Sequence, residues 1–375
     1  MKQVKKAFVY RIYPNDLQKE MFAKTFGCAR KIWNLMLDDR INSYKQYQED
    51  GTPIKETTPA MYKKDYPYLK EVDSLALANE QMHLRRAFAN FFRNSKTVGY
   101  PKFKSKNRDR NSYMTNNQNG TIAIIDKQGI KLPKVGVVSM DYHREHTGKI
   151  KSVTISQDAT GAYYVAILCD TEVESFAKTN SSIGIDMGLH HYVVLSDGTK
   201  IENPKYLKKD MQRLQKLQRK LSRKAEIAKA KGIKLEDAKN YQKLKITIAR
   251  LHKRIYNRRH DFLHKLSTYL IKNHDVICVE KLSVKKMLES HLAQAITDAG
   301  WTKFLALLKY KAEWYGKSIK EVEPYYPSTQ ICHVCGSKES KKALHIREWE
   351  CSSCHSYHDR DINAAINIHQ HGLAI

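Results

Sequence analysis

The sequence contains no uncharged apolar run long enough to cross a bilayer, and residues 1–13 lack the continuous apolar stretch and small-residue cleavage site of a secretory signal. It also shows no internal repeat, which argues against a solenoid or a propeller. These absences predict a soluble, intracellular protein with no membrane partner.

Acidic residues are scarce relative to basic ones. The chain has 39 Asp and Glu residues against 66 Lys and Arg residues, which gives a net charge of +27. A polyanionic partner is the natural inference, although ribosomal and membrane-surface proteins are basic as well, so charge alone leaves the partner open. The length of 375 residues and the 41% hydrophobic content predict two or three domains with real cores, which argues against general disorder.

Cysteines are few, and four of the seven form two close pairs. Cys28, Cys169 and Cys278 stand singly among apolar residues, which is typical of core packing. The pairs Cys332-Cys335 and Cys351-Cys354 are separated by fifteen residues, and this C-x₂-C-x₁₅-C-x₂-C spacing is typical of one closed, structural zinc site with four thiolate ligands. Redox disulfides are the alternative, which a reducing compartment disfavours.

The N-terminal half of the sequence combines helical and β-rich segments. Residues 6–13 alternate polar and apolar side chains and predict a strand; a helix follows, with Asn15 as N-cap, Gln18 three residues later and an apolar stripe that starts at Leu17. Residues 75–93 predict another helix. Between residues 121 and 169, short β-rich runs broken by glycines predict a small barrel or sandwich, so the helices look like a lobe inserted into a β domain.

A mixed aromatic and basic segment, residues 100–113, joins these two parts. Tyr100, Phe103 and Tyr113 alternate with Lys102, Lys104 and other cations. Aromatic side chains that stack on bases, beside cations that contact phosphates, suit single-stranded nucleic acid. A solvated linker is the other interpretation, and the sequence leaves both open.

A strand, a glycine-containing turn and a second strand begin at Ser182, and a long basic helical stretch follows. Two apolar stripes separated by a turn near Gly232 predict two long antiparallel helices. Their polar faces carry many cations with few acids to neutralise them, which favours a surface that binds a polyanion over an ordinary solvated face. The candidate contacts are Lys216, Arg219, Arg223, Arg250, Arg254 and Arg258.

Three acidic residues occupy positions where a carboxylate is hard to explain by packing. Asp186 lies at the end of an apolar strand beside Gly188, and Glu280 lies in the apolar strand 276–282. Asp361 begins a helix whose apolar face is Ala364, Ala365 and Ile368, while Asp359 suits the N-cap of that helix. The small alanines predict close packing of this helix on the strands.

Carboxylates from two strands and one helix are what a two-metal phosphodiesterase needs. Two Mg²⁺ or Mn²⁺ ions, held by oxygen ligands about 4 Å apart, would activate water and stabilise the leaving 3′ oxygen. Each acid taken singly has several explanations. The occurrence of all three in this order is a more specific indication of a metal site.

With these motifs in order, the chain resembles the TnpB proteins of bacterial and archaeal insertion sequences, which are relatives of type V CRISPR effectors. The resemblance covers essentially the whole chain. It is most specific at GIDMGL (184–189), VEKL (279–282), the cysteine pairs, and REWECSSC followed by HDRDINAA.

The resemblance implies a multidomain α+β protein: an RNase H-like (RuvC) nuclease domain with a zinc ribbon, and an N-terminal wedge β-barrel with a helical recognition insertion. The expected bounds are 1–13 and 113–178 for the barrel, 14–112 for the recognition lobe and 179–375 for the nuclease. The nuclease would include a basic hairpin at 205–272 and the ribbon at 328–358. By the same resemblance, Asp186, Glu280 and Asp361 are the catalytic acids, and Cys332, Cys335, Cys351 and Cys354 are the zinc ligands.

The function implied is guide-directed cleavage of DNA beside a short target-adjacent motif. The expected partners are a guide RNA derived from the transposon end and target double-stranded DNA, and the protein is expected to be monomeric, cytoplasmic and nucleoid-associated. His355 departs from the family, which usually has glycine in the second cysteine turn, so we expect a slightly strained but intact ribbon. A transposase and a nuclease-inactive guided DNA-binding protein are the alternatives, and the intact acids disfavour the second.

Overall fold

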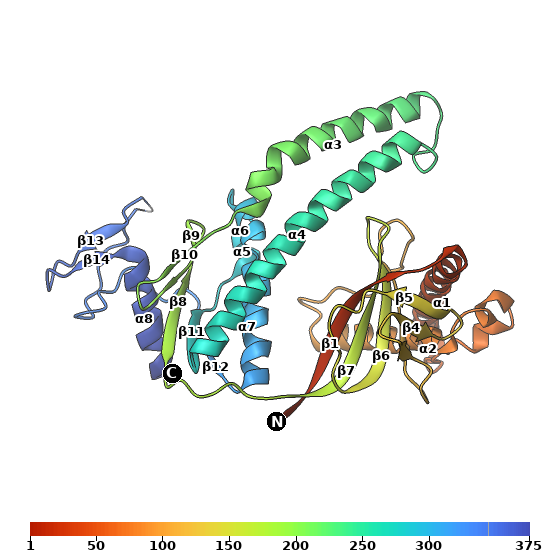
Figure 1. Ribbon diagram of the computed structural model, residues 1–375, viewed down its shortest axis with the longest axis horizontal. Helices are drawn as coiled ribbons and strands as arrows, with labels where there is room; N and C mark the ends of the chain where they lie inside the picture. The colour runs from red at the N-terminus through yellow and green to blue at the C-terminus, as the bar shows by residue number, and fades with distance from the viewer. Residues whose placement is uncertain (344) are drawn as a thin grey trace. The chain divides into compact units, whose positions relative to one another are not determined.

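The computed structural model describes residues 1–343 and 345–375, and its elements are labelled in Figure 1. The chain divides into two compact units, which are described separately. We call Gln3–Glu172 the N-terminal unit, and Met1–Lys2 with Val173–Ile375 the C-terminal unit. Both units combine helices with a sheet. No helix in the described part of the chain is long and apolar enough to cross a membrane.

The N-terminal unit is a seven-stranded sheet with two long helices between its first and second strands. The strand order is β2-β6-β7-β1-β5-β4-β3, so the first strand lies in the middle of the sheet. The elements are β1 Lys2–Tyr13, α1 Asp16–Asp50, the 3₁₀ turns Met61–Lys63 and Pro67–Lys70, α2 Ser74–Arg93, β2 Asn111–Asn116, β3 Ala123–Ile125, β4 Gly129–Leu132, β5 Gly136–Met140, β6 Lys149–Gln157 and β7 Tyr163–Val173.

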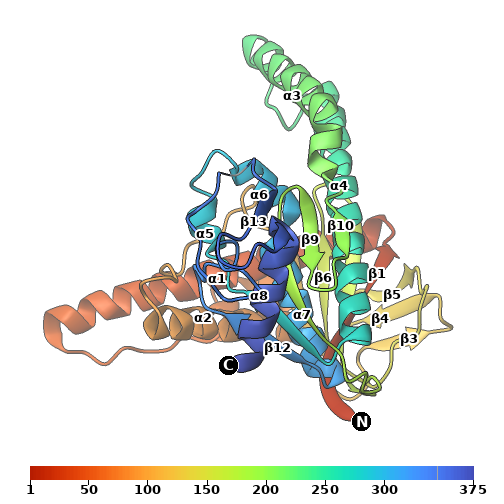
Figure 2. The ribbon, with the colours of Figure 1, turned by 90° about the vertical axis from the view of Figure 1, so that its left-hand side faces the viewer.

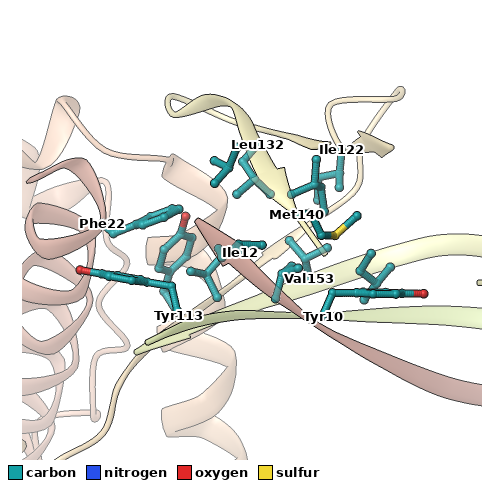
Figure 3. Packing of buried hydrophobic residues seen from close by; sticks show 14 of the residues in the cluster. Tyr10, Ile12, Phe22, Tyr113, Ile122, Leu132, Met140 and Val153 are labelled. Carbon is teal, nitrogen blue, oxygen red and sulfur yellow. The ribbon is translucent and has the colours of Figure 1, made fainter. Parts of the chain in front are cut away.

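Apolar side chains from the strands and from α1 form one core in this unit. Figure 3 shows Tyr10 and Ile12 of β1 in the same cluster as Phe22 of α1 and Val153 of β6. Tyr113 belongs to this core: it is 3% exposed, and its ring packs on Phe22 and on Phe26. Tyr113 is therefore not available to stack on bases, which was one of the two interpretations left open for residues 100–113, because strand alternation turns this position inward.

The start of α1 follows the sequence prediction. Asn15 and Gln18 form a reciprocal capping box, in which each side chain accepts a hydrogen bond from the other residue's backbone N–H. The apolar stripe begins later than predicted, since Leu17 is 78% exposed. The buried face of α1 instead starts at Phe22, and its later turns form a second core with α2 and the 3₁₀ turns around Ile32 and Leu77.

The C-terminal unit is built on a five-stranded sheet of order β10-β9-β8-β11-β12, in which β8, β11 and β12 are parallel. Helix α8 lies on one face of this sheet, and α4 and α7 lie on the other (Figure 1). The elements are β8 Ser182–Met187, β9 His191–Leu195, β10 Lys200–Glu202, α3 Tyr206–Ala230, α4 Lys239–Asn273, β11 Val276–Glu280, α5 Val284–Met287, α6 Ala293–Ala299, α7 Trp301–Tyr315, β12 Ser318–Val322, β13 Glu348–Glu350, β14 Tyr357–Asp359 and α8 Arg360–Ala374.

Alternation along β8 decides which side chains face α8. Ile183, Ile185 and Met187 enter the core with α4 and α7, whereas Gly184 contacts α8. Asp186 lies two residues after Gly184 in the same strand, so its side chain is on the same face of the sheet, the face that α8 covers.

The basic stretch forms two long helices side by side, α3 and α4, as Figures 1 and 2 show. Leu214 of α3 and Ile248, Leu251 and Ile255 of α4 form their apolar seam. Gly232 follows α3 with a left-handed φ of 65°. The predicted antiparallel helices and the turn near Gly232 are confirmed, and so is the burial of Cys28, Cys169 and Cys278.

Candidate active site and cysteine cluster

The three predicted acids come from three elements of the C-terminal unit. Asp186 is the fifth residue of β8, and Glu280 is the last residue of β11. Each lies one residue beyond the last pair of these parallel strands, Ile185 with Val279. Asp361 is the second residue of α8. Because the carboxyl ends of parallel strands meet at one edge of a sheet, the first two acids share that edge.

Two glycines allow α8 to pack unusually close to the strands. A Cβ at Gly184 would lie 2.2 Å from the carbonyl oxygen of Ala365, and a Cβ at Gly372 would lie 2.6 Å from the Sγ of Cys278. The first contact is with backbone, which cannot rotate away. The small Ala364 and Ala365 are fully buried at this contact, as their size predicts.

We expect Gly184→Ala to lower the free energy of unfolding by roughly 1–3 kcal/mol, because the added methyl group must push α8 off the sheet. The same displacement moves Asp361 away from Asp186. The rate of a reaction that needs both carboxylates should therefore fall by a larger factor than the loss of folded protein explains. Thermal denaturation and cleavage kinetics measure the two effects. Gly99→Ala is the comparison, since that glycine has nothing within 4 Å and does not have a left-handed φ. Unchanged stability and rate for Gly184→Ala would contradict this packing.

The electrostatics show that the three carboxylates are close enough to interact. Burial, then the negative charges of Asp361 and Glu280, raise the pKa of Asp186 to about 7. Burial also raises the pKa of Glu280. Negative charges crowded at a partly buried site are costly unless a cation joins them, so this cluster suits a divalent metal with hard oxygen ligands.

Arg347 is a member of this site that the sequence did not reveal. Its guanidinium Nη1 lies 3.2 and 3.3 Å from the two carboxylate oxygens of Asp361, and its charge acts to lower the pKa of Asp186. It precedes β13 and is the first residue of the REWECSSC segment, but nothing in that segment indicates a contact with an acidic side chain. Only the fold brings it beside an acid fourteen positions later.

Asp359 caps α8, as predicted. Its Oδ1 accepts hydrogen bonds from the backbone N–H groups of Asp361 and Ile362, both at 3.0 Å. Its Oδ2 lies 2.5 Å from the ammonium of Lys200 on β10. Asp359 is therefore engaged in holding the helix start, whereas the side chain of Asp361 faces Arg347 and the other two acids.

Two buried asparagines on α8, which were not among the predicted site residues, join this helix to the first cysteine turn. The side-chain amides of Asn363 and Asn367 donate to the carbonyls of Ser328 and Ile331 at 2.6–3.3 Å. Two asparagines four positions apart on an otherwise apolar helix face are the signal that could have found them. They fix Asp361 relative to the cysteine cluster.

The four paired cysteines come together in space. Their sulfurs all lie within 4.8 Å of one another, and no other group of three or more Cys, His, Asp and Glu side chains within residues 1–343 and 345–375 is as compact. Among the described residues, the three acids do not form a group of this kind. Cys332 lies 3.6 Å from Cys354, and Cys335 lies 3.7 Å from Cys351.

These sulfur distances fit a metal and not a disulfide. A disulfide needs an S–S distance of about 2.05 Å. Four sulfurs about 2.3 Å from a tetrahedral zinc lie about 3.8 Å apart. The cysteines are all free thiols, and their arrangement matches the zinc geometry.

The two cysteine turns have matching backbones. Gly336 donates its N–H to the carbonyl of Cys332 at 2.9 Å, and His355 donates to that of Cys351 at 3.0 Å. Both residues have left-handed φ values, 77° for Gly336 and 55° for His355. His355 therefore adopts the left-handed conformation that glycine favours, and the hydrogen bond of its turn is present.

The predicted nucleic-acid contacts differ in their surroundings. The six hairpin cations, Lys216, Arg219, Arg223, Arg250, Arg254 and Arg258, are all exposed, and Arg254 pairs with Asp210 at 2.8 Å. Lys102 is exposed as well. Lys104 instead lies 2.7 Å from the buried Glu80 and over the ring of Trp33, so its ammonium has an internal structural role.

Family models match most of the chain in three segments. Residues 166–291 match a family described as "Probable transposase", residues 301–368 match a "Cas12f1-like, TNB domain", and residues 1–49 match a "Helix-turn-helix domain". In the structure, residues 1–49 form β1 and most of α1, so this segment contains one helix and no helix-turn-helix.

Relatives extend the similarity over the whole length. A protein of Streptomyces pristinaespiralis is 37% identical over 383 residues, covering 100% of this chain and 91% of the relative. This chain belongs to the TnpB family. InsQ of Escherichia coli K12 is 31% identical and covers 98% of this chain and 92% of its own. Both relatives are named as RNA-guided DNA endonucleases, and other matches are named TnpB-like.

The fold also matches a solved structure. The Cas12f1 chain in a complex with single guide RNA and target DNA aligns with a TM-score of 0.56 at 13% sequence identity, over 98% of each chain. At this identity the match concerns the fold alone, and it is consistent with membership of the TnpB family.

Proposed function

We propose that this protein is an RNA-guided DNA endonuclease that hydrolyses phosphodiester bonds of guide-matched double-stranded DNA beside a short target-adjacent motif. The observation that carries the proposal is the convergence of Asp186, Glu280 and Asp361 from β8, β11 and α8 on one edge of the sheet. The names of the relatives that match over the whole chain indicate DNA as the substrate and RNA as the guide.

In this proposal the three carboxylates hold two Mg²⁺ or Mn²⁺ ions. Oxygen ligands and like charges beside one another fit such ions. When bound, they would activate water and stabilise the leaving 3′ oxygen. Strands β8 and β11 would hold Asp186 and Glu280 on a rigid edge of the sheet. Asp359 caps α8 and would thereby hold Asp361 within reach of the other two acids. Arg347 keeps Asp361 oriented through its contacts with both carboxylate oxygens.

The domain assignment follows from the same proposal. The C-terminal unit would be the RNase H-like (RuvC) nuclease, with its basic hairpin and a zinc ribbon at 328–358. The sheet of the N-terminal unit would be the wedge barrel, and α1 and α2 the recognition lobe. One zinc would bind to Cys332, Cys335, Cys351 and Cys354, because the spacing of the four sulfurs fits tetrahedral coordination.

The guide RNA, which we take to derive from the transposon end, would bind a monomeric protein through the hairpin of α3 and α4. The exposed cations on these helices form a long surface with few acids, and the chain's charge of +27 favours release of counterions from phosphates. The protein should therefore copurify with one dominant RNA species, and its cleavage of double-stranded DNA should depend on the guide segment of that RNA.

Reversing Arg250, Arg254 and Arg258 to glutamate together should weaken RNA binding and reduce its salt dependence. Each lost phosphate contact lowers the slope of log K against log salt by roughly 0.7–0.9, so three contacts lower it by roughly 2–3. Filter binding across a salt series measures this slope. The matched control replaces the same three residues by lysine, which keeps the charge and should bind nearly as the wild type does.

Two outcomes would overturn the guided mechanism. One is equal cleavage by RNA-free protein, and the other is unchanged RNA affinity after charge reversal. Strand transfer by RNA-free protein would instead support the transposase that the description of the family model names.

A further inference from the structure

A histidine that belongs to neither predicted site lies against the cysteine cluster. His358 is the middle residue of β14, where it pairs with Trp349 of β13. It is 3% exposed, and its Nε2 lies 3.1 Å from the Sγ of Cys332. His358 is nevertheless outside the group of four sulfurs that lie within 4.8 Å of one another.

The direction of this hydrogen bond follows from the chemistry of the cluster. Cysteines that ligate a metal are thiolates, which can accept a hydrogen bond but cannot donate one. Nε2 of His358 must then carry the proton and donate it. A hydrogen bond of this kind spreads the negative charge of a sulfur that shares one divalent ion with three other thiolates.

The other ring nitrogen supports the same tautomer. Within the described residues, Nδ1 of His358 is buried without a hydrogen-bond partner. The ring lies among those of Trp349 and His333, with centroids 4.5 and 4.7 Å away. A buried N–H without an acceptor costs more than a bare lone pair, so the proton belongs on Nε2 and the ring is neutral.

The position of His358 in the chain connects the cluster to the acids. The next residue, Asp359, caps α8 and contacts Lys200, and Asp361 follows two positions later. A bond that holds His358 against Cys332 therefore also holds the start of α8.

We propose that His358 is a positioning residue whose Nε2–H donates to the Cys332 thiolate, and that this bond slows zinc loss and fixes the first turn of the helix that carries Asp361. The inference rests on the zinc site of the proposed function. Its tests read zinc and the imidazole directly, so they do not depend on DNA cleavage.

The first test uses the unmodified protein. Nitrogen NMR of zinc-loaded protein with labelled histidine should show His358 neutral and protonated on Nε2. A proton on Nδ1 would overturn the proposal, and so would coordination of the metal by Nε2. A protein that holds no zinc at all would instead defeat the zinc site of the proposed function.

The second test compares variants by the rate at which zinc passes to a chromogenic chelator. His358→Leu removes the donor and should release zinc roughly 10–100-fold faster, the usual effect of losing an outer-shell partner. His358→Gln places an amide N–H near the position of Nε2 and should stay within about threefold of the wild type. His358→Asn is too short to reach and should behave as leucine does.

Tyr357→Phe is the control, because it removes the neighbouring hydrogen bond to Glu348 without touching the cluster. Cobalt-substituted protein gives a second readout, since the sulfur-to-metal absorption band should shift in the leucine variant and be restored in the glutamine variant. Equal zinc release by the leucine, asparagine and wild-type proteins would overturn the proposal. If the leucine variant does not fold, the glutamine and asparagine pair and the NMR result still decide it.

Discussion

Asp186→Ala, Glu280→Ala and Asp361→Ala should each reduce the rate of DNA cleavage by at least about 10³-fold, which corresponds to roughly 4 kcal/mol of barrier. Each change removes one of the proposed metal ligands, which lie in a cluster where the charges of Asp361 and Glu280 help to raise the pKa of Asp186. Affinity for RNA and DNA should remain near that of the wild type, because phosphate contacts arise elsewhere on the protein. Single-turnover cleavage and filter binding measure the two quantities.

The control for Asp361 is its neighbour Asp359. Asp359→Ala removes the N-cap of α8, which should cost roughly 1 kcal/mol of stability and leave measurable cleavage. If Asp359→Ala is inactive and Asp361→Ala is active, the last acid has been assigned wrongly. Near-normal cutting by any of the three alanine variants would remove that residue from the site.

Loss of the metal from the cysteine cluster should inactivate the enzyme even though the cluster is separate from the acids. Apparent binding free energies of structural zinc are about 10–16 kcal/mol, so the fold of residues 328–358 depends on it. Asn363 and Asn367 tie α8 to the first cysteine turn, and loss of that turn leaves the first turn of α8 without its supports. Cys332→Ser or Cys351→Ser should therefore abolish cleavage and expose this region to proteases.

Elemental analysis should find one zinc per chain in the wild type and less in these variants. Cys278→Ala is the matched control. Cys278 is fully buried, and it packs against Gly372 of α8 and not within the cysteine cluster. It should lose stability and keep its zinc. Freshly purified protein that is active without zinc would refute the structural role of the metal.

Much of the local structure could be predicted because it depends on neighbouring residues. The capping box of Asn15 and Gln18, the N-cap Asp359 and the left-handed His355 all follow from short-range backbone chemistry. The cysteine spacing is informative for the same reason, since each pair lies within a single turn. Leu17 shows the limit of periodicity, which identified the helix but not where its buried face begins. Tyr113 shows another limit, because the mixed composition of residues 100–113 did not indicate the strand β2 that buries this side chain.

The sequence by itself determined the residue types of both sites, three carboxylates in apolar surroundings and four cysteines at metal spacing. It also determined the cationic surface of the long helices. Only the tertiary structure decided that α8 packs on the face of β8 that carries Gly184 and Asp186. It also decided that Arg347 lies beside Asp361 and that His358 lies beside Cys332. The physical reason is that such contacts join residues far apart in the chain, and their partners are set by packing between elements, which leaves no periodic signal in the sequence.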